Sequence, residues 1–291
     1  MTDIPCPFPR SVTISRKPQP EGGQAPVVQR IRIRYAKRGP LRFTSHRDFA
    51  RAFERALRRA NAPVAFSQGF TPHPKISYAS AAPTGVASEA EYLEIGLQRA
   101  VDPDELRVAL DAALSPGLDV LAAVESAGGS LADRIDASHW RIELAGVGSA
   151  QAETAVAAFL SAGEVLVERL TKQGRRTFDA RAAVLRMTVA AGAATPAGPG
   201  VRPPDGLPSE VSSVPCAILD LVVRQVTPSV RPDDVLSGLR VMADLEPPVP
   251  PRVTRLAQGT LTAQGEIVDP LEADRVGQPS VNASRVPAGA Q

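Results

Sequence analysis

The fold class of this chain is decided by residues 28–60, VQRIRIRYAKRGPLRFTSHRDFARAFERALRRA. Within its first eight residues, residues 30–35 alternate between basic and apolar side chains, which is the pattern of a strand with one buried face. Ile31, Ile33 and Tyr35 share one side of this strand, and the arginines between them share the other. After a Gly39-Pro40 turn the period changes, which predicts that a helix follows the strand.

The helix is expected from His46 to about Ala60. Ser45 is followed three residues later by Asp48, which resembles a capping box with Asp in place of the usual Glu or Gln. The expected apolar stripe recurs at the 3.6-residue period of a helix. It consists of Phe49, Ala52, Phe53, Ala56, Leu57 and Ala60. The helix therefore packs through its apolar stripe and shows its arginines to solvent.

The rest of the chain continues to mix strand and helix patterns up to about residue 262. Further strands are predicted at 64–66, 76–79, 91–97, 118–124, 140–144, 164–170, 180–190, 217–224 and 253–262. Further helices are predicted at 102–114, 150–160 and 231–239. This order predicts an α+β fold of two tandem ferredoxin-like βαββαβ units with antiparallel sheets.

Composition divides the chain further. Residues 1–27 are rich in Pro, Gly and Ser and show no periodicity, so we expect a disordered leader. We expect a basic N-terminal ferredoxin-like domain at 28–135 and a second one at 136–268. The second domain contains a Pro/Gly-rich loop at about 191–214, and residues 269–291 are expected to be a disordered tail.

Charge is distributed unevenly along the sequence. The net charge is only +2, yet residues 30–75 contain twelve Lys or Arg and two acids, an excess of +10 that leaves −8 for the remainder. Such a segment predicts a surface that follows phosphates, with binding that weakens steeply in salt. The alternative is an arginine-rich helix that presents no more than a solvated face. The residues expected to bind an anion or RNA are Arg32, Arg34, Lys37, Arg38, Arg42, Arg47, Arg51, Arg55, Gln68, Gly69, Phe70, His73 and Lys75.

The segment 67–75, SQGFTPHPK, is the most distinctive loop of the chain. Gly69 permits an unusual backbone dihedral, the prolines stiffen the loop, and the His-Pro-Lys end suits an anion. Phe70 is the one plausible stacking side chain for a base. The alternative is a stiff hairpin connection in which His73 and Lys75 are incidental.

Several classes of site and location are not supported. The chain has two cysteines far apart, Cys6 and Cys216, and three scattered histidines, so we expect no disulfide framework, no metal site and no cofactor. No apolar run reaches the length of a membrane span, and prolines break the N-terminal stretch. We therefore expect a cytoplasmic protein that does not enter a membrane.

Three segments resemble a family of domains of unknown function that is linked to radical SAM enzymes. They are YAKRGPLRFTSHRD at 35–48, SQGFTPHPKISY at 67–78, and PTGV at 83–86 together with Glu91-Tyr92-Leu93. The resemblance spans residues 28–97 and implies either fusion to a radical SAM protein or pairing with a separate one. This chain has no Cys-x-x-x-Cys-x-x-Cys segment. The resemblance therefore implies an accessory protein that binds RNA or substrate for a radical SAM enzyme or for RNA-processing machinery.

Two alternative functions stay open. The expected fold, basic helix and glycine-containing loop also resemble the repeat-RNA processing endonucleases of CRISPR systems, which implies metal-independent cleavage with His46 and His73 as candidate acid–base residues. The glycine-rich loop that those enzymes carry near the C-terminus is not evident here. The other alternative is a protein–protein adaptor that never contacts nucleic acid.

Overall fold

The computed structural model describes residues 26–68, 70–171, 174–193 and 215–275. The strands are β1 (Gln29–Lys37), β2 (Ile76–Ala79), β3 (Ala87–Leu97), β4 (Leu118–Glu125), β5 (Ala137–Ala145), β6 (Leu166–Thr171), β7 (Gly174–Asp179), β8 (Val184–Ala193), β9 (Pro215–Arg224), β10 (Arg252–Leu261) and β11 (Ile267–Val268). The helices are α1 (His46–Arg59), α2 (Pro103–Ala113), α3 (Ser149–Ser161), α4 (Pro232–Ala243) and α5 (Glu272–Arg275). Three short 3-10 helices span Gly39–Phe43, Ala132–Arg134 and Arg181–Ala183.

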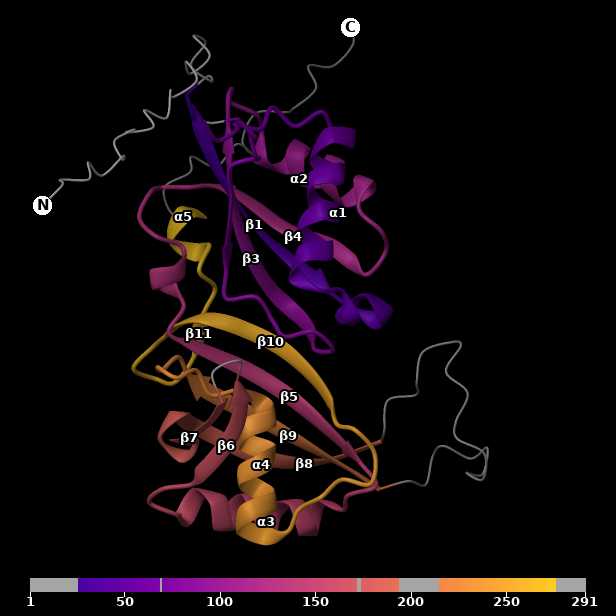
Figure 1. Cartoon of the computed structure of the whole chain (residues 1–291), viewed down its shortest axis with the longest axis vertical. Helices are drawn as coiled ribbons and strands as arrows, with labels where there is room; N and C mark the ends of the chain where they lie inside the picture. Colours follow the sequence, from indigo (N-terminus) through magenta and orange to yellow (C-terminus); the bar gives the residue numbers. More distant parts are fainter. Residues whose placement is uncertain (1–25, 69, 172–173, 194–214, 276–291) are drawn as a thin grey trace, which may run out of the picture.

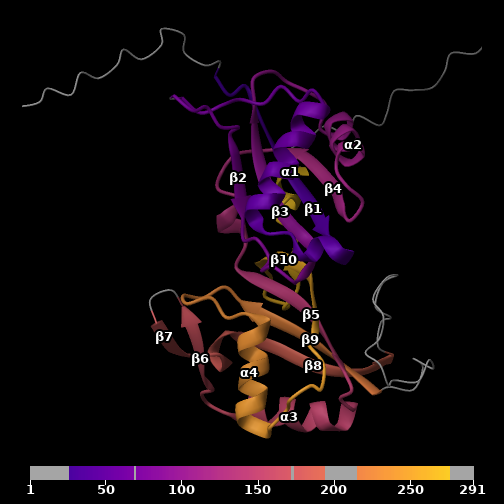
Figure 2. The same ribbon diagram turned by 45° about the vertical axis from the view of Figure 1, so that its right-hand side comes forward.

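Nine of the described strands form one sheet, which runs through both halves of the molecule (Figure 1). Its path is β4-β1-β3-β10-β5-β9-β8, with β2 beside β3 and β11 beside β10, while β6 and β7 form a separate pair. The pairings are antiparallel except that of β3 with β10. Figure 2 shows β10 between the first-half strands and β5. The α+β fold class is confirmed.

The two halves therefore share a sheet rather than having one each. First-half strands take the order β4-β1-β3-β2, and second-half strands take the order β10-β5-β9-β8. A two-residue parallel pairing, Thr254 with Ala87 and Arg255 with Ser88, joins the halves. The hairpin of β6 and β7 adds strands between α3 and β8. The division into two tandem ferredoxin-like units stays a prediction.

Most predicted elements are present, and the exceptions have local causes. The predicted strand at 180–190 begins later, at Val184, and is preceded by β7, which the sequence pattern did not indicate. β7 has the sequence GRRTFD, in which Phe178 alone is buried, so it has almost no apolar alternation. The predicted strand at 64–66 contributes only isolated bridges, from Val64 to Leu97 and from Phe66 to Pro74.

Two large cores lie between helices and the sheet. In the first half, α1 and α2 cover the face of β1, β3 and β4 that carries Ile31, Ile33 and Tyr35 (Figure 1). In the second half, α3 and α4 cover β5, β8 and β9, with Phe159 and Leu239 fully buried. The alternation seen in residues 28–35 therefore sets the buried face of β1 as expected.

The segment 269–275 differs from its expected place in a disordered tail. Leu271 is completely buried in a third core with Tyr92, Val124 and Ile135. Figure 1 shows the adjoining helix α5 on the opposite side of the first-half strands from α1 and α2. A four-residue helix is too short to show periodicity in a sequence, because its stability comes from tertiary contacts. Residues 1–25, 194–214 and 276–291, expected to be leader, loop and tail, lie outside the described residues.

The three tyrosines of the chain give the first half a testable response to alkali. Burial raises the pKa of Tyr35, of Tyr78 and of Tyr92, and nearby Glu91, Glu54 and Asp269 respectively raise it further. Each raised pKa adds stability that is fully present below the ordinary tyrosine value of about 10 and is lost as the pH rises through the folded-state value. We expect no appreciable tyrosinate absorbance at 295 nm in native protein at about pH 10.5, and half-ionisation near pH 10 in denaturant. Tyrosinate formation before loss of secondary structure would contradict this burial.

Candidate nucleic-acid interface

The outward face of α1 carries a stripe of arginines. Ser45 caps the helix, its Oγ accepting from the backbone N–H of Asp48 at 3.2 Å, as the sequence predicts. Phe49, Phe53 and Leu57 turn towards the sheet and are buried. The opposite face therefore points to solvent over the whole helix. The exposed arginines on it are Arg47, Arg51, Arg55 and Arg58.

These four guanidinium groups have no hydrogen-bond or ion-pair partner within the residues that the structure describes. The acids of the helix do not neutralise them. Asp48 instead accepts a hydrogen bond from Ser45 at 2.7 Å, and Glu54 forms no ion pair within the described part of the chain. Exposed cations in such a row attract a polyanion, and they do so more strongly at low salt.

An exposed aromatic side chain lies in the 3-10 helix just before α1. The guanidinium carbon of Arg42 lies 4.6 Å from the ring centroid of Phe43, and Phe43 is 59% exposed. The Arg42 carbonyl accepts a 2.8 Å hydrogen bond from the N–H of Gly85, which ties this helix to the PTGV segment. An arginine above an exposed ring offers both charge and a stacking surface.

The described residues of the SQGFTPHPK loop are linked by hydrogen bonds just before β2. Ser67 and His73 are joined twice, by Ser67 N–H to the His73 carbonyl at 2.8 Å and by His73 N–H to Ser67 Oγ at 3.0 Å. The N–H of Lys75 donates to the Ala65 carbonyl at 2.8 Å. Phe70 is 77% exposed at the tip. The side chains of Gln68, His73 and Lys75 are also exposed, and Gly69 lies outside the described residues.

The two candidate acid–base histidines sit in different settings. His46 is exposed at the start of α1, and its ring meets Tyr78 edge-on with centroids 4.7 Å apart. His73 belongs to the loop hairpin. Within the described residues no hydrogen bond joins the two imidazole rings, so the structure does not bring them together as a pair.

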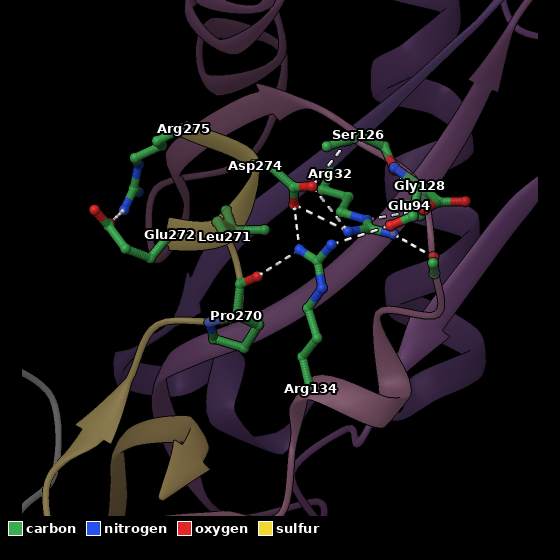
Figure 3. Close-up of polar contacts among 12 residues, drawn as sticks. Arg32, Glu94, Ser126, Gly128, Arg134, Pro270, Leu271, Glu272, Asp274 and Arg275 are labelled. Atoms are coloured by element: carbon green, nitrogen blue, oxygen red, sulfur yellow. Dashed lines mark hydrogen bonds and ion pairs between the residues drawn. The ribbon is translucent and has the colours of Figure 1, made fainter. Parts of the chain in front are cut away.

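Arg32, expected to contact RNA, is instead buried completely in β1. Its Nε donates to Glu94 at 2.9 Å, and its Nη1 donates to both carboxylate oxygens of Asp274 at 3.0 Å (Figure 3). Its Nη2 donates to the carbonyls of Gly128 and Gly129 at 3.0 and 2.6 Å. Every side of this guanidinium is occupied, so Arg32 stabilises the fold and offers no contact to RNA.

Arg34 and Arg38 are also neutralised by carboxylates. Arg34 pairs with Asp269 at 3.0 Å, and Arg38 pairs with Glu89 and, at 2.6 Å, with Asp119. These bonds raise the pKa of Arg38 above its ordinary value, the hydrogen bond that Arg38 donates to Glu89 being the largest cause. Glu89 lies in the strand next to β1 and Asp119 lies in the other neighbouring strand. A count of charge along the sequence cannot register pairs formed across a sheet.

Lys37 is buried at the end of β1, where it was expected on the surface. Its Nζ donates long hydrogen bonds to the carbonyls of Ala82 and Pro83, at 3.4 and 3.3 Å. Burial lowers the pKa of this amine, nearby Arg255 lowers it further, and Glu91 opposes the change. Of the residues expected to bind RNA, two groups in the described part of the chain therefore have no carboxylate partner: the exposed α1 face with the half-buried Arg42, and the loop.

Sequence reasoning missed three residues with notable settings. Arg58 completes the α1 stripe and could have been included from the 3.6-residue period. Asp274 and Arg255 are buried charges that contact the first half from far along the chain, at Arg32 and Glu91 respectively. No local pattern identifies such long-range contacts.

Among the described residues, no group of three or more His, Cys, Asp and Glu side chains is placed to hold a metal ion. None of the helices in the described ranges has the length and apolar content to cross a membrane.

Comparison with known proteins provides a family but no function. No curated protein matches this sequence. Solved structures of DtpA from Streptomyces lividans, an X-ray generated oxyferrous complex and the ferric form, align at 13% and 12% identity. They cover 86% and 88% of this chain and 94% and 95% of their own, with a TM-score of 0.20 in both cases, which supports no inference.

The family match covers more than half of the chain. The sequence model of the family described as "Uncharacterized protein conserved in bacteria (DUF2344)" matches residues 30–232. The matched range includes β1, the arginine face of α1, the SQGFTPHPK loop and the start of α4. This chain therefore belongs to the bacterial DUF2344 family.

Proposed function

We propose that this chain is a cytoplasmic accessory protein that binds RNA for a separate enzyme. The observation that carries the proposal is the face of α1, where Arg47, Arg51, Arg55 and Arg58 are exposed without a carboxylate partner in the described part of the chain. Positively charged side chains in a row follow a phosphate backbone, while exposed aromatic rings stack on unpaired bases. Phe43, Phe66 and Phe70 are exposed rings that flank α1 in the sequence, and Phe43 and Phe70 are the more exposed of them.

The partner that we propose is a radical SAM enzyme or RNA-processing machinery. This chain lacks the three-cysteine segment of radical SAM chemistry, so the reaction would belong to the partner. Its own role would be to hold the RNA substrate. No catalytic role is assigned to His46 or His73, because no contact brings the two rings together.

Salt-dependent binding tests this function. We expect a fluorescent single-stranded RNA to bind with log K falling against log salt at a slope of about −3, since four phosphate contacts on a single strand each contribute about −0.7. The double reversal Arg51→Glu and Arg55→Glu is expected to weaken binding roughly 100-fold at low salt and to reduce the slope to about −1.5. Fluorescence anisotropy across a salt series measures both quantities.

A control variant with the same change in net charge, made elsewhere on the surface, shows whether the position of the arginines or only the net charge of the protein determines RNA binding. Arg175→Glu with Arg240→Glu alters two exposed arginines of the second half. We expect this double variant to keep most of the affinity and the original slope. Equal loss in both double variants, or no salt-sensitive binding by the parent chain, would defeat the proposal. Binding to an acidic protein that survives nuclease treatment would favour the adaptor alternative.

A further inference from the structure

A cavity of about 400 Å³ lies where strands of the two halves meet, with Arg255 of β10 among its lining residues. Its volume is within the range of small-molecule sites. It is lined from β5, β10, the PTGV segment and the connection that leads into α4. The polar groups on its wall include Thr84, Ser138, Trp140, Ser229, Arg231 and Arg255. None of the described residues that line it is Asp or Glu.

Two buried basic side chains, Arg255 and Lys37, lie near the cavity together with one buried carboxylate, Glu91. Arg255 is 2% exposed, and its guanidinium donates to Glu91, to Gln258 at 3.1 Å and to Ser88 at 3.3 Å. These bonds use three of the five N–H groups of an arginine. Lys37 is buried beside the same carboxylate. Since Glu91 can balance one positive charge, the surroundings of the cavity retain an excess of positive charge.

The indole of Trp140 provides a second, independent sign of an unfilled polar site. Trp140 is 6% exposed, and its Nε1 has no hydrogen-bond acceptor within the described residues. The guanidinium carbon of Arg255 lies 5.3 Å from the ring centroid. Buried indole N–H groups normally have an acceptor, so the Trp140 N–H is a donor that the described fold leaves unsatisfied in a residue that lines the cavity.

The backbone at Ser80, another lining residue, is strained. Ser80 lines the cavity with φ of +47°, a conformation uncommon for residues other than glycine. Strained backbone of this kind collects at ligand sites.

The exposed guanidinium of Arg231, which also lines the cavity, has no ion-pair partner in the described ranges.

A second cavity of similar size shows that volume alone does not single out this site. It measures about 410 Å³ and lies between α4 and the proline-rich segment that follows. Asp233, Glu246 and Arg240 line it, so carboxylates outnumber cations there. The cavity lined by Arg231 and Arg255, called the junction cavity below, is different. The described residues on its wall supply hydrogen-bond donors and positive charge and include no carboxylate.

We propose that the junction cavity binds a phosphate monoester. The cavity offers more hydrogen-bond donors, from its guanidiniums, indole N–H and hydroxyls, than the two oxygens of a carboxylate ligand would use. A phosphate monoester suits these donors better, because it has three terminal oxygens that each accept several hydrogen bonds. Arg231 at the mouth and Arg255 at the wall supply charge-assisted contacts. The cavity is distinct from the α1 face, so this inference does not depend on RNA binding there.

Tryptophan fluorescence tests the proposal directly, because Trp140 is the only tryptophan in the chain. The full chain is titrated with inorganic phosphate, with adenosine 5′-monophosphate and with adenosine, at constant ionic strength. We expect a saturable change in emission with both phosphate compounds and none with adenosine. No change with either phosphate compound up to roughly 10 mM, or an equal change with adenosine, would overturn the proposal.

Variants at exposed positions locate the site without disturbing the buried network. Arg231→Ala is expected to weaken phosphate binding by roughly 10- to 100-fold, the usual effect of losing a charge-assisted hydrogen bond. Arg240→Ala, from the other cavity, is the matched control and should leave the affinity unchanged. Unchanged affinity in Arg231→Ala would overturn the assignment.

A further experiment distinguishes two sources of the bound phosphate, the 5′ end of an RNA and a free small molecule. Tighter binding of a 5′-phosphorylated oligonucleotide than of its 5′-hydroxyl form, with the difference lost in Arg231→Ala, would place the end of an RNA in the cavity. Equal binding of the two oligonucleotides together with saturable phosphate binding would indicate a free small molecule. The α1 double variant should retain phosphate binding, which keeps failure of this site separate from failure of the RNA face.

Discussion

Asp274→Ala is expected to lower the free energy of unfolding by about 3–5 kcal/mol, the usual cost of leaving a buried charge without its partner. Asp274 is fully buried and accepts hydrogen bonds from Arg32 at 3.0 Å and from Arg134 at 2.7 Å (Figure 3). Its removal leaves Arg32 at the centre of the sheet with only Glu94 as a charged partner. Urea unfolding followed by circular dichroism measures the change.

Glu272→Ala is the matched control in the same short helix. Glu272 is exposed and pairs only with Arg275, at 2.8 Å. An exposed pair of this kind contributes at most about 1 kcal/mol, so the control should unfold close to the parent chain. Equal stability of both variants would show that segment 269–275 does not hold the first half together.

Acid should weaken the same contact. Burial raises the pKa of Asp274, but the hydrogen bonds from the Ala127 N–H, from Arg134 and from Arg32 together outweigh burial, and the pKa lies below its ordinary value. The stability that this carboxylate contributes is therefore present above about pH 4 and is lost as the pH falls through the folded-state value. In Asp274→Ala that part of the acid dependence should be missing.

Glu91→Ala is expected to cost a similar amount, about 3–5 kcal/mol. Glu91 is 2% exposed, pairs with Arg255 and accepts from the Ala82 N–H at 3.1 Å. Without it, Arg255 and Lys37 are left as buried positive charges with no carboxylate between them. Thermal and urea unfolding of the purified variant measure the loss.

Two further variants make this prediction specific. Glu89→Ala, two residues earlier on β3, removes a partly exposed partner of Arg38 and should cost no more than about 1 kcal/mol. Lys37→Met combined with Glu91→Ala should recover part of the loss, since one uncompensated charge is removed. If the double variant were as unstable as the sum of the two single variants, Lys37 and Glu91 would not be coupled.

The elements that depend on local pattern could be predicted from the sequence. The alternation of β1 and the 3.6-residue stripe of α1 identify both elements and their buried faces, and Ser45 marks the start of the helix. These features depend on neighbours within a few residues. The arginine face of α1 could be predicted for the same reason, because the side opposite a buried stripe must be exposed.

The features that depend on distant contacts could not be predicted in this way. From the local pattern, Arg32 is predicted to be one more basic residue on an exposed strand face. Its burial follows from the ion pair with Asp274, which is far along the chain. The cavity at the junction likewise requires β10 to lie beside β3, a pairing of only two residues. The charge counted along the sequence therefore overstated the basic surface, since the arginines of β1 form ion pairs within the fold.

The central claim is that RNA contacts α1, while the arginines of β1 are paired with carboxylates of the fold. Photo-crosslinking of the full chain to a 4-thiouridine RNA, followed by mass spectrometry of the crosslinked peptides, tests this claim most directly. We expect crosslinks in peptides that cover residues 39–59 and 66–75, and none in residues 29–37. Crosslinks concentrated on residues 29–37, or crosslinks that persist unchanged in the Arg51→Glu and Arg55→Glu variant, would contradict it.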